Sequence, residues 1–285
     1  MQRATPVGAA LLTACALIGA VPGHAQTEVS ADLGLYSAYM WRGLTLTNKP
    51  VAQPAVYLSI PVGNASLTLG GWSTIDLGKY DDLADDISQS GGSSAFNLAE
   101  FDPIVEVSFP VGKATLTAGG TAYLYHNDED APGFGLLTSD NNTVEIYGKA
   151  EFDTPLSPGL AIYYDVDKIK GAYFEGSVSH SFPASEKVSI DLGAVVGFNA
   201  GQGLSDDPDQ SFNFADDGFT HADISAGVPL TAGAFSITPV LHLIIAGDDF
   251  TKITSPTNTS DAKLWGGVTI SWARTLGEAP EEPAE

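Results

Sequence analysis

Hydrophobic and polar residues alternate with a period of two along most of the chain. Across 144–152 the even positions are apolar or small, and the odd positions are Glu145, Tyr147, Lys149 and Glu151. Successive side chains of a β-strand point to opposite faces, so this pattern predicts a strand with one apolar and one polar face. About twelve segments of this kind follow one another, bounded by Pro, Gly, Asn and Asp: 29–42, 52–60, 65–76, 97–109, 114–126, 143–152, 160–167, 171–182, 188–198, 219–228, 234–246 and 262–272.

The connections between these segments alternate between short and long. Short turns are expected at 61–64, 110–113, 154–158, 183–186 and 229–233. Long polar loops are expected at 43–51, 77–95, 127–142, 199–218 and 247–261, with a short exception at 168–170. Outer-membrane barrels have tight turns at the periplasmic rim, long loops at the external rim and strands of about ten residues. The pattern therefore predicts an all-β fold over 26–273: a transmembrane, antiparallel, up-and-down β-barrel of about twelve strands.

The first residues predict export. Arg3 precedes an apolar run from Val7 to Val21, and small residues lead to a cleavage position after Ala25. This arrangement is typical of a secretory signal peptide, assigned to 1–25. A lipoprotein box ending at Cys15 is the alternative, but another apolar stretch follows that residue instead of a polar tether. The only cysteine falls in this segment, so a mature chain would form no disulfide.

Composition and charge fit a barrel better than a soluble acidic protein. The chain has 12 Lys and Arg against 35 Asp and Glu, a formal net charge of −23 and a hydrophobic fraction of 44%. This charge argues against nucleic-acid binding, and the apolar content is too high for a disordered polymer. A barrel in a bilayer separates apolar from acidic residues, because the aliphatic side chains face lipid while the acids occupy the loops and the lumen. The segment 274–285, rich in Glu and Pro, is predicted to be an acidic disordered tail.

Aromatic residues near the ends of the segments are predicted to form the interfacial girdles of such a barrel. They are Tyr39, Trp41, Phe109, Tyr123, Phe152, Phe182, Phe198, Trp265 and Trp272.

The polar strand faces supply candidate pore-lining residues. They are Asp32, Arg42, Asp76, Glu100, Asp102, Glu106, Glu145, Tyr147, Lys149, Glu151, Asp165, Glu175, Asp191, Asp223 and Lys263. A lumen dominated by carboxylates attracts cations. We expect an outer-membrane, porin-like channel for passive diffusion of small hydrophilic solutes, with cations preferred if the lumen is open. The alternative is a closed barrel, filled by acids paired with bases and tyrosines, that binds partners through its loops or stabilises the envelope. Barrels of about eight strands are filled and those of about sixteen are open, and twelve lies between.

Other chemistry is weakly indicated. The loops carry acidic runs that suit divalent cations bridging to lipopolysaccharide, although such runs are usually only solvated. His221 and His242 share strand faces with Asp223 and nearby serines, which leaves a barrel hydrolase as a third alternative. No Gly-x-Ser-x-Gly, His-Glu-x-x-His or phosphate-binding motif is present in the sequence. We therefore expect no enzyme activity, cofactor or metal site, and the sequence leaves the oligomeric state open.

One stretch carries a family resemblance. The run Tyr36-Ser-Ala-Tyr-Met-Trp-Arg-Gly-Leu-Thr45, followed by Pro50 and Gln53-Pro-Ala55, resembles the opening of the TorF-like (Gcw_chp) outer-membrane porin family of Gram-negative bacteria. Weaker similarities are Gly70-Gly-Trp-Ser73, Glu100-Phe-Asp102, Leu156-Ser-Pro-Gly-Leu160, Tyr163-Tyr-Asp165 and Ala172-Tyr-Phe-Glu175. The resemblance implies an outer-membrane barrel and names no solute. One departure is that residues 273–285 follow Trp272, the aromatic that would end the barrel.

Overall fold

The computed structural model of the chain describes residues 26–88, 95–125, 142–185, 188–206 and 211–276. The predicted signal peptide at 1–25 and most of the predicted tail lie outside these ranges. No helix in the described part is long and apolar enough to cross a membrane.

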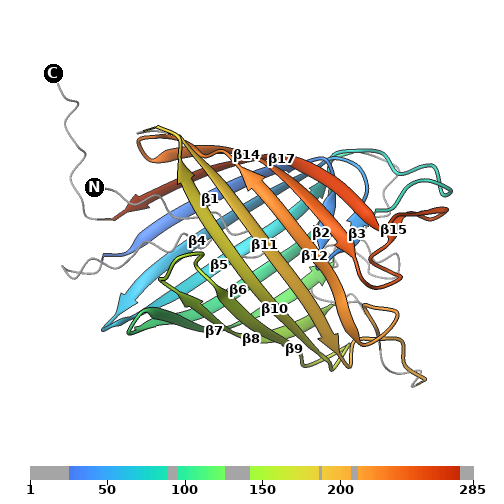
Figure 1. The fold of residues 1–285 in the computed structure, drawn as a ribbon, viewed down its shortest axis with the longest axis horizontal. Helices are drawn as coiled ribbons and strands as arrows, with labels where there is room; N and C mark the ends of the chain where they lie inside the picture. The colour runs from blue at the N-terminus through green and yellow to red at the C-terminus, as the bar shows by residue number, and fades with distance from the viewer. Residues whose placement is uncertain (1–25, 89–94, 126–141, 186–187, 207–210, 277–285) are drawn as a thin grey trace.

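Twelve antiparallel strands form a closed barrel (Figure 1). They are β1 (Glu28–Tyr36), β4 (Val51–Val62), β5 (Ala65–Asp76), β6 (Asn97–Val111), β7 (Ala114–Tyr125), β8 (Thr143–Phe152), β9 (Gly159–Asp165), β10 (Ala172–Pro183), β11 (Ser189–Ala200), β12 (Gly218–Gly227), β14 (Phe235–Ala246) and β17 (Ala262–Thr275). Each pairs with the next along the chain, and β17 closes the ring by pairing with both β14 and β1. The predicted fold class is thus confirmed, and the last strand runs two residues past the expected barrel end at 273.

Five short strands lie outside this ring order. β13 (Leu230–Ala232) extends the turn beside β14, and β15 (Ile253–Ser255) pairs with β16 (Asn258–Thr259) in a long loop. β2 (Tyr39–Trp41) and β3 (Leu44–Thr47) form a separate two-stranded sheet between β1 and β4. The described ends of the chain lie at the short-turn rim, and β2, β3 and β15 lie toward the long-loop rim (Figure 1).

The strands are amphipathic in the direction the sequence predicts. On β6, Glu100 and Glu106 are 1% and 5% exposed, whereas Val105 and Val107, which point outward, are 51% and 42% exposed. The same alternation gives the whole outer wall a continuous apolar surface of Val, Leu, Ile and Phe. A patch of this size is rare on a protein that lies in water, whereas closed barrels in lipid require it.

The prediction of one continuous strand over 29–42 is wrong, because the chain leaves the barrel wall partway along this segment. β1 ends at Tyr36, and β2 follows as part of the separate hairpin. The backbone reverses at Arg42 and Gly43, which have φ of +49° and +83°. Left-handed φ angles at two successive residues make a tight turn, so the chain cannot continue along the wall.

Four of the nine predicted girdle aromatics are also wrong, because they lie inside the barrel. Tyr39, Tyr123 and Trp265 are 2%, 3% and 5% exposed, and Trp41 packs edge-to-face on the Tyr123 ring. Tyr123 and Trp265 occupy inward positions of their strands, and the other two belong to the hairpin. The outward aromatics Phe109, Phe152, Phe182 and Phe198 are 37–49% exposed, and Trp272 occupies an outward position of β17.

Candidate functional site: a hairpin across the lumen

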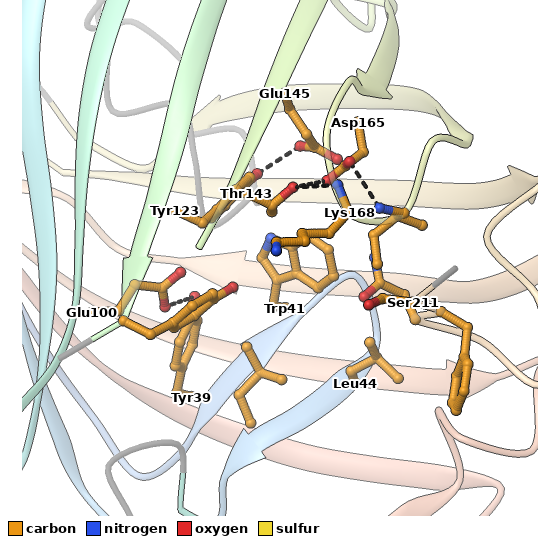
Figure 2. A pocket seen from close by; sticks show the side chains of 15 residues that line it. Tyr39, Trp41, Leu44, Glu100, Tyr123, Thr143, Glu145, Asp165, Lys168 and Ser211 are labelled. Carbon is orange, nitrogen blue, oxygen red and sulfur yellow. Dashed lines mark hydrogen bonds between the residues drawn. The ribbon is translucent and has the colours of Figure 1, made fainter. Parts of the chain in front are cut away.

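The β2–β3 hairpin projects into the barrel from the connection between β1 and β4. Its residues Tyr39 and Met40 are buried, and Leu44 and Leu46 are half-buried against side chains of the wall. Side chains of the hairpin point toward the same space as wall side chains such as Glu100 and Glu145 (Figure 2). The hairpin therefore occupies the lumen, and apolar contacts hold it there.

The tip of the hairpin is clamped to one wall through Arg42. Its Nη1 and Nη2 donate hydrogen bonds to Glu145 Oε1 and Oε2 at 2.7 and 2.8 Å. Its guanidinium also lies over the rings of Trp41, Tyr163 and Tyr173, with centroid distances of 4.3, 4.6 and 4.2 Å. The two charged side chains are 6% and 2% exposed. A bidentate, desolvated pair of this kind is geometrically specific, and it fixes the tip in one position.

The opposite wall holds the other side of the tip. Lys263 Nζ on β17 donates to the Gly43 carbonyl oxygen at 2.5 Å and to Thr45 Oγ1 at 3.1 Å. β17 and β8, which carries Glu145, are diametrically opposite in the ring: β1, β4, β5, β6 and β7 separate them on one side, and β14, β12, β11, β10 and β9 on the other. The hairpin tip thus bridges the full width of the lumen.

The base of the hairpin is tied to the neighbouring long loop. Thr47 Oγ1 donates to Asp76 Oδ1 at 3.1 Å, and Lys49 Nζ lies 2.6 Å from Asp86 Oδ1. The hydrogen bond from Lys49 lowers the pKa of the Asp86 carboxyl below its ordinary value. An ion pair at the loop rim contributes little to stability.

The other predicted pore-lining residues lie on inward strand faces, and Arg42 enters the lumen on the hairpin tip instead of on a strand. Several of them are paired. Glu106 accepts hydrogen bonds from Lys149 Nζ and Tyr147 Oη, both at 2.9 Å, and His242 Nδ1 lies 3.1 Å from both Asp223 carboxylate oxygens. The pairing of acids with bases and tyrosines matches part of the closed-barrel alternative. The sequence predicted that these side chains point into the lumen, but it did not predict which residues they pair with.

The two halves of the lumen differ in lining. Toward the short turns the inward side chains include small hydroxyls, such as the pairs Ser59–Thr68 and Ser108–Thr117 with oxygens 3.0 and 2.8 Å apart, beside the charged Glu106 and Lys149. Toward the long loops they are large aromatics, including a row formed by Tyr147, Tyr163, Tyr173 and Phe214. Small side chains leave more cross-section than tyrosines do, so we expect the lumen to be narrowest at the level of the hairpin.

A cavity of about 220 Å³ lies beside the hairpin. Tyr39 and Trp41 line it from the hairpin, and Glu100, Tyr123 and Glu145 line it from the wall (Figure 2). Asp165 and Lys168 border it at the end of β9 and in the following loop. Asp165 is held in place by Thr143 Oγ1 at 2.6 Å and by the amide of Ile169 at 2.9 Å.

A hydrolase site finds little support in the geometry. The Asp223–His242 pair resembles two members of a catalytic triad, but His242 stacks on Trp265 with centroids 4.1 Å apart. Within the described residues, the only hydrogen bond between a histidine and a hydroxyl joins His221 to its neighbour Thr220. No group of three or more His, Cys, Asp or Glu in the described ranges is placed to hold a metal ion. A triad needs a nucleophile aligned with its base.

Gly43, at the hairpin tip, has no room for a side chain. A Cβ there would lie 2.7 Å from the Cβ of His221, and its φ of +83° disfavours any side chain. We expect Gly43→Ala to cost about 1–3 kcal/mol of unfolding free energy and to displace the hairpin tip. Gly63→Ala is the matched control, because its φ is +66° but nothing lies within 4 Å. Urea unfolding in lipid vesicles measures both, and equal losses would show that the tip does not press on His221.

No known family model matches the sequence, and no curated protein does. Several solved outer-membrane proteins are distantly similar to the chain. An outer membrane channel from Pseudomonas putida F1 is 8% identical, with a TM-score of 0.48 over 90% of this chain and 97% of that one. The NanC porin is 8% identical, with a TM-score of 0.45 over 86% of this chain and 98% of that one. The P. putida toluene transporter TodX is 8% identical, with a TM-score of 0.42 over 90% of this chain and 92% of that one. Similarities this distant assign neither a family nor a function, and the TorF-like resemblance stays a prediction.

Proposed function

We propose that this protein is an outer-membrane channel for passive diffusion of small hydrophilic solutes, and that the β2–β3 hairpin forms its narrowest point. The observation that carries the proposal is the bridge from Glu145 through Arg42 and Gly43 to Lys263, which crosses the lumen inside a wall that is apolar outside and polar inside. A loop folded into a polar lumen sets the pore radius without filling its whole length.

The outer wall supports the membrane location. A closed ring of strands leaves no edge strand with unpaired backbone N–H and C=O groups, and its apolar outer face suits contact with lipid. The long loops would then face the cell exterior, because outer-membrane barrels place short turns at the periplasmic rim. On this proposal the partners are bilayer lipid and lipopolysaccharide outside, with divalent cations as bridges to the acidic loops, and small solutes inside.

The lumen charge favours cations. Asp32, midway along β1, and Glu151, near the short-turn end of β8, face inward, and Lys149 on the same face of β8 already contacts Glu106. Fixed carboxylates in a low-dielectric channel raise the local concentration of cations. Asp32 and Glu151 are therefore proposed to set selectivity, apart from the hairpin.

Single-channel recording in a planar bilayer under a KCl gradient tests the channel and its selectivity together. We expect steady unitary currents and a reversal potential on the cation-selective side. The double variant Asp32→Asn, Glu151→Gln is expected to move the reversal potential toward zero with little change in conductance. An unchanged reversal potential would remove these acids from selectivity, and no current from a folded barrel would reject the channel.

A closed, loop-binding barrel is the second candidate. The observation that favours it is the burial of the Arg42–Glu145 pair, which leaves little room on that side of the lumen. Both candidates share the fold, so conductance of the folded protein decides between them.

A further inference from the structure

The surroundings of Arg42 are those of a recognition site for a guanidinium group. A carboxylate receives two parallel N–H···O bonds at 2.7 and 2.8 Å, and three aromatic faces lie within 4.6 Å of the guanidinium carbon. A forked carboxylate supplies the geometry that a planar guanidinium matches and an ammonium does not. Aromatic faces add cation–π attraction, which is strongest away from water.

Most of this site belongs to the barrel wall and not to the hairpin. Glu145 is on β8, Tyr163 on β9 and Tyr173 on β10, three consecutive strands of the ring. Tyr123 on β7 orients the carboxylate by donating to Glu145 Oε2 at 2.7 Å. Only Trp41 comes from the hairpin. A site built on paired strands would keep its shape if Arg42 left it.

The hairpin is less firmly attached than the site it fills. β2 and β3 pair only with each other and form no ladder with the wall. The tip is held by side-chain contacts: Arg42 to Glu145, Lys263 to the Gly43 carbonyl and Thr45 hydroxyl, and Thr45 to the Ile253 carbonyl. Displacing the tip would therefore break side-chain contacts and none of the strand pairings that close the barrel.

A cavity adjoins the site on the long-loop side, where the loop residues Lys168 and Ser211 belong to its lining. The 220 Å³ cavity shares Trp41, Tyr123 and Glu145 with the site. Glu100 and Asp165 add carboxylates to its lining, against the single base Lys168 among the residues that line it. A cation in this cavity therefore meets an attractive potential and lies next to Glu145.

From these four observations we infer that the barrel wall carries a binding site for guanidinium-bearing solutes, and that Arg42 is its built-in occupant. A solute with this group enters through the cavity, takes the carboxylate and the tyrosine faces from Arg42, and releases the hairpin tip from β8. The inference rests on the proposed channel for its transport role, whereas the binding site itself stands on the geometry.

The test uses Arg42→Ala in detergent, with guanidinium chloride as the probe at millimolar concentrations and NaCl at equal ionic strength as the reference. We expect saturable quenching of tryptophan fluorescence by guanidinium in this variant and none by sodium. Adding Glu145→Gln should weaken the binding about tenfold or more, since a charged hydrogen-bond partner is lost. Arg274→Ala, at the exposed end of β17, should behave as the wild type, in which Arg42 competes for the site and the probe binds more weakly than in Arg42→Ala.

The outcomes separate the inference from the proposed channel. Absence of a guanidinium-specific signal in a folded Arg42→Ala protein overturns the site, whatever the conductance. A signal that persists unchanged with Glu145→Gln overturns it as well. Guanidinium binding without any current in bilayers keeps the site and rejects the channel. Heat-modifiable gel mobility verifies folding, and Arg42→Met, which keeps the aliphatic stem, replaces the Ala variant if that one does not fold.

Discussion

Arg42→Met and Glu145→Gln are each expected to lower the unfolding free energy by about 3 kcal/mol, because each leaves a buried charged group without its partner. The double variant should lose about as much as either single variant, since its second change removes the group left unpaired by the first. Urea titration of protein folded into lipid vesicles, followed by tryptophan fluorescence, measures all three.

Arg274→Met is the control for the arginine substitution, because Arg274 is exposed at the end of β17. Its change should stay within about 0.5 kcal/mol. Additive losses in the double variant would mean that Arg42 and Glu145 stabilise the protein independently. The clamp across the lumen would then be an incidental contact.

A second large effect is expected on the outer wall. Ile224 lies in the middle of β12, points outward and is 49% exposed. Ile224→Arg should cost about 2–4 kcal/mol in a bilayer, because a charged side chain at mid-depth is transferred to hydrocarbon. Leu83→Arg is the matched control, since Leu83 is 91% exposed in the loop after β5. Equal, small effects of both substitutions in vesicles would contradict a lipid-facing wall.

The wall of the barrel could be predicted because its signals are local. Period-two alternation and turn residues lie within each segment, and eleven of the twelve predicted segments match strands of the ring within a few residues. The hairpin could not be recognised in the same way. Tyr39 and Trp41 alternate with their neighbours as wall residues do, and a strand that turns inward keeps the same period.

One local signal does mark the point where the chain leaves the wall. The segment 29–42 is longer than the roughly ten residues that a tilted strand needs, and an Arg-Gly step ends it. The partners of the site are non-local. Arg42 and Glu145 lie 103 positions apart, and Lys149 and Glu106 lie 43 apart. The sequence could therefore predict whether each of these side chains points into the lumen. Which residue it pairs with depends on how the ring of strands closes.

The most direct test of the constriction is the single-channel conductance of a variant without the hairpin. Tyr36 and Val51 are opposite each other in the β1–β4 ladder, so an Asn-Gly turn in place of residues 37–50 leaves the wall intact. We predict a conductance several-fold above that of the wild type, with cation preference retained. A folded variant whose conductance equals the wild-type value, or that passes no current, would contradict a channel narrowed by this hairpin.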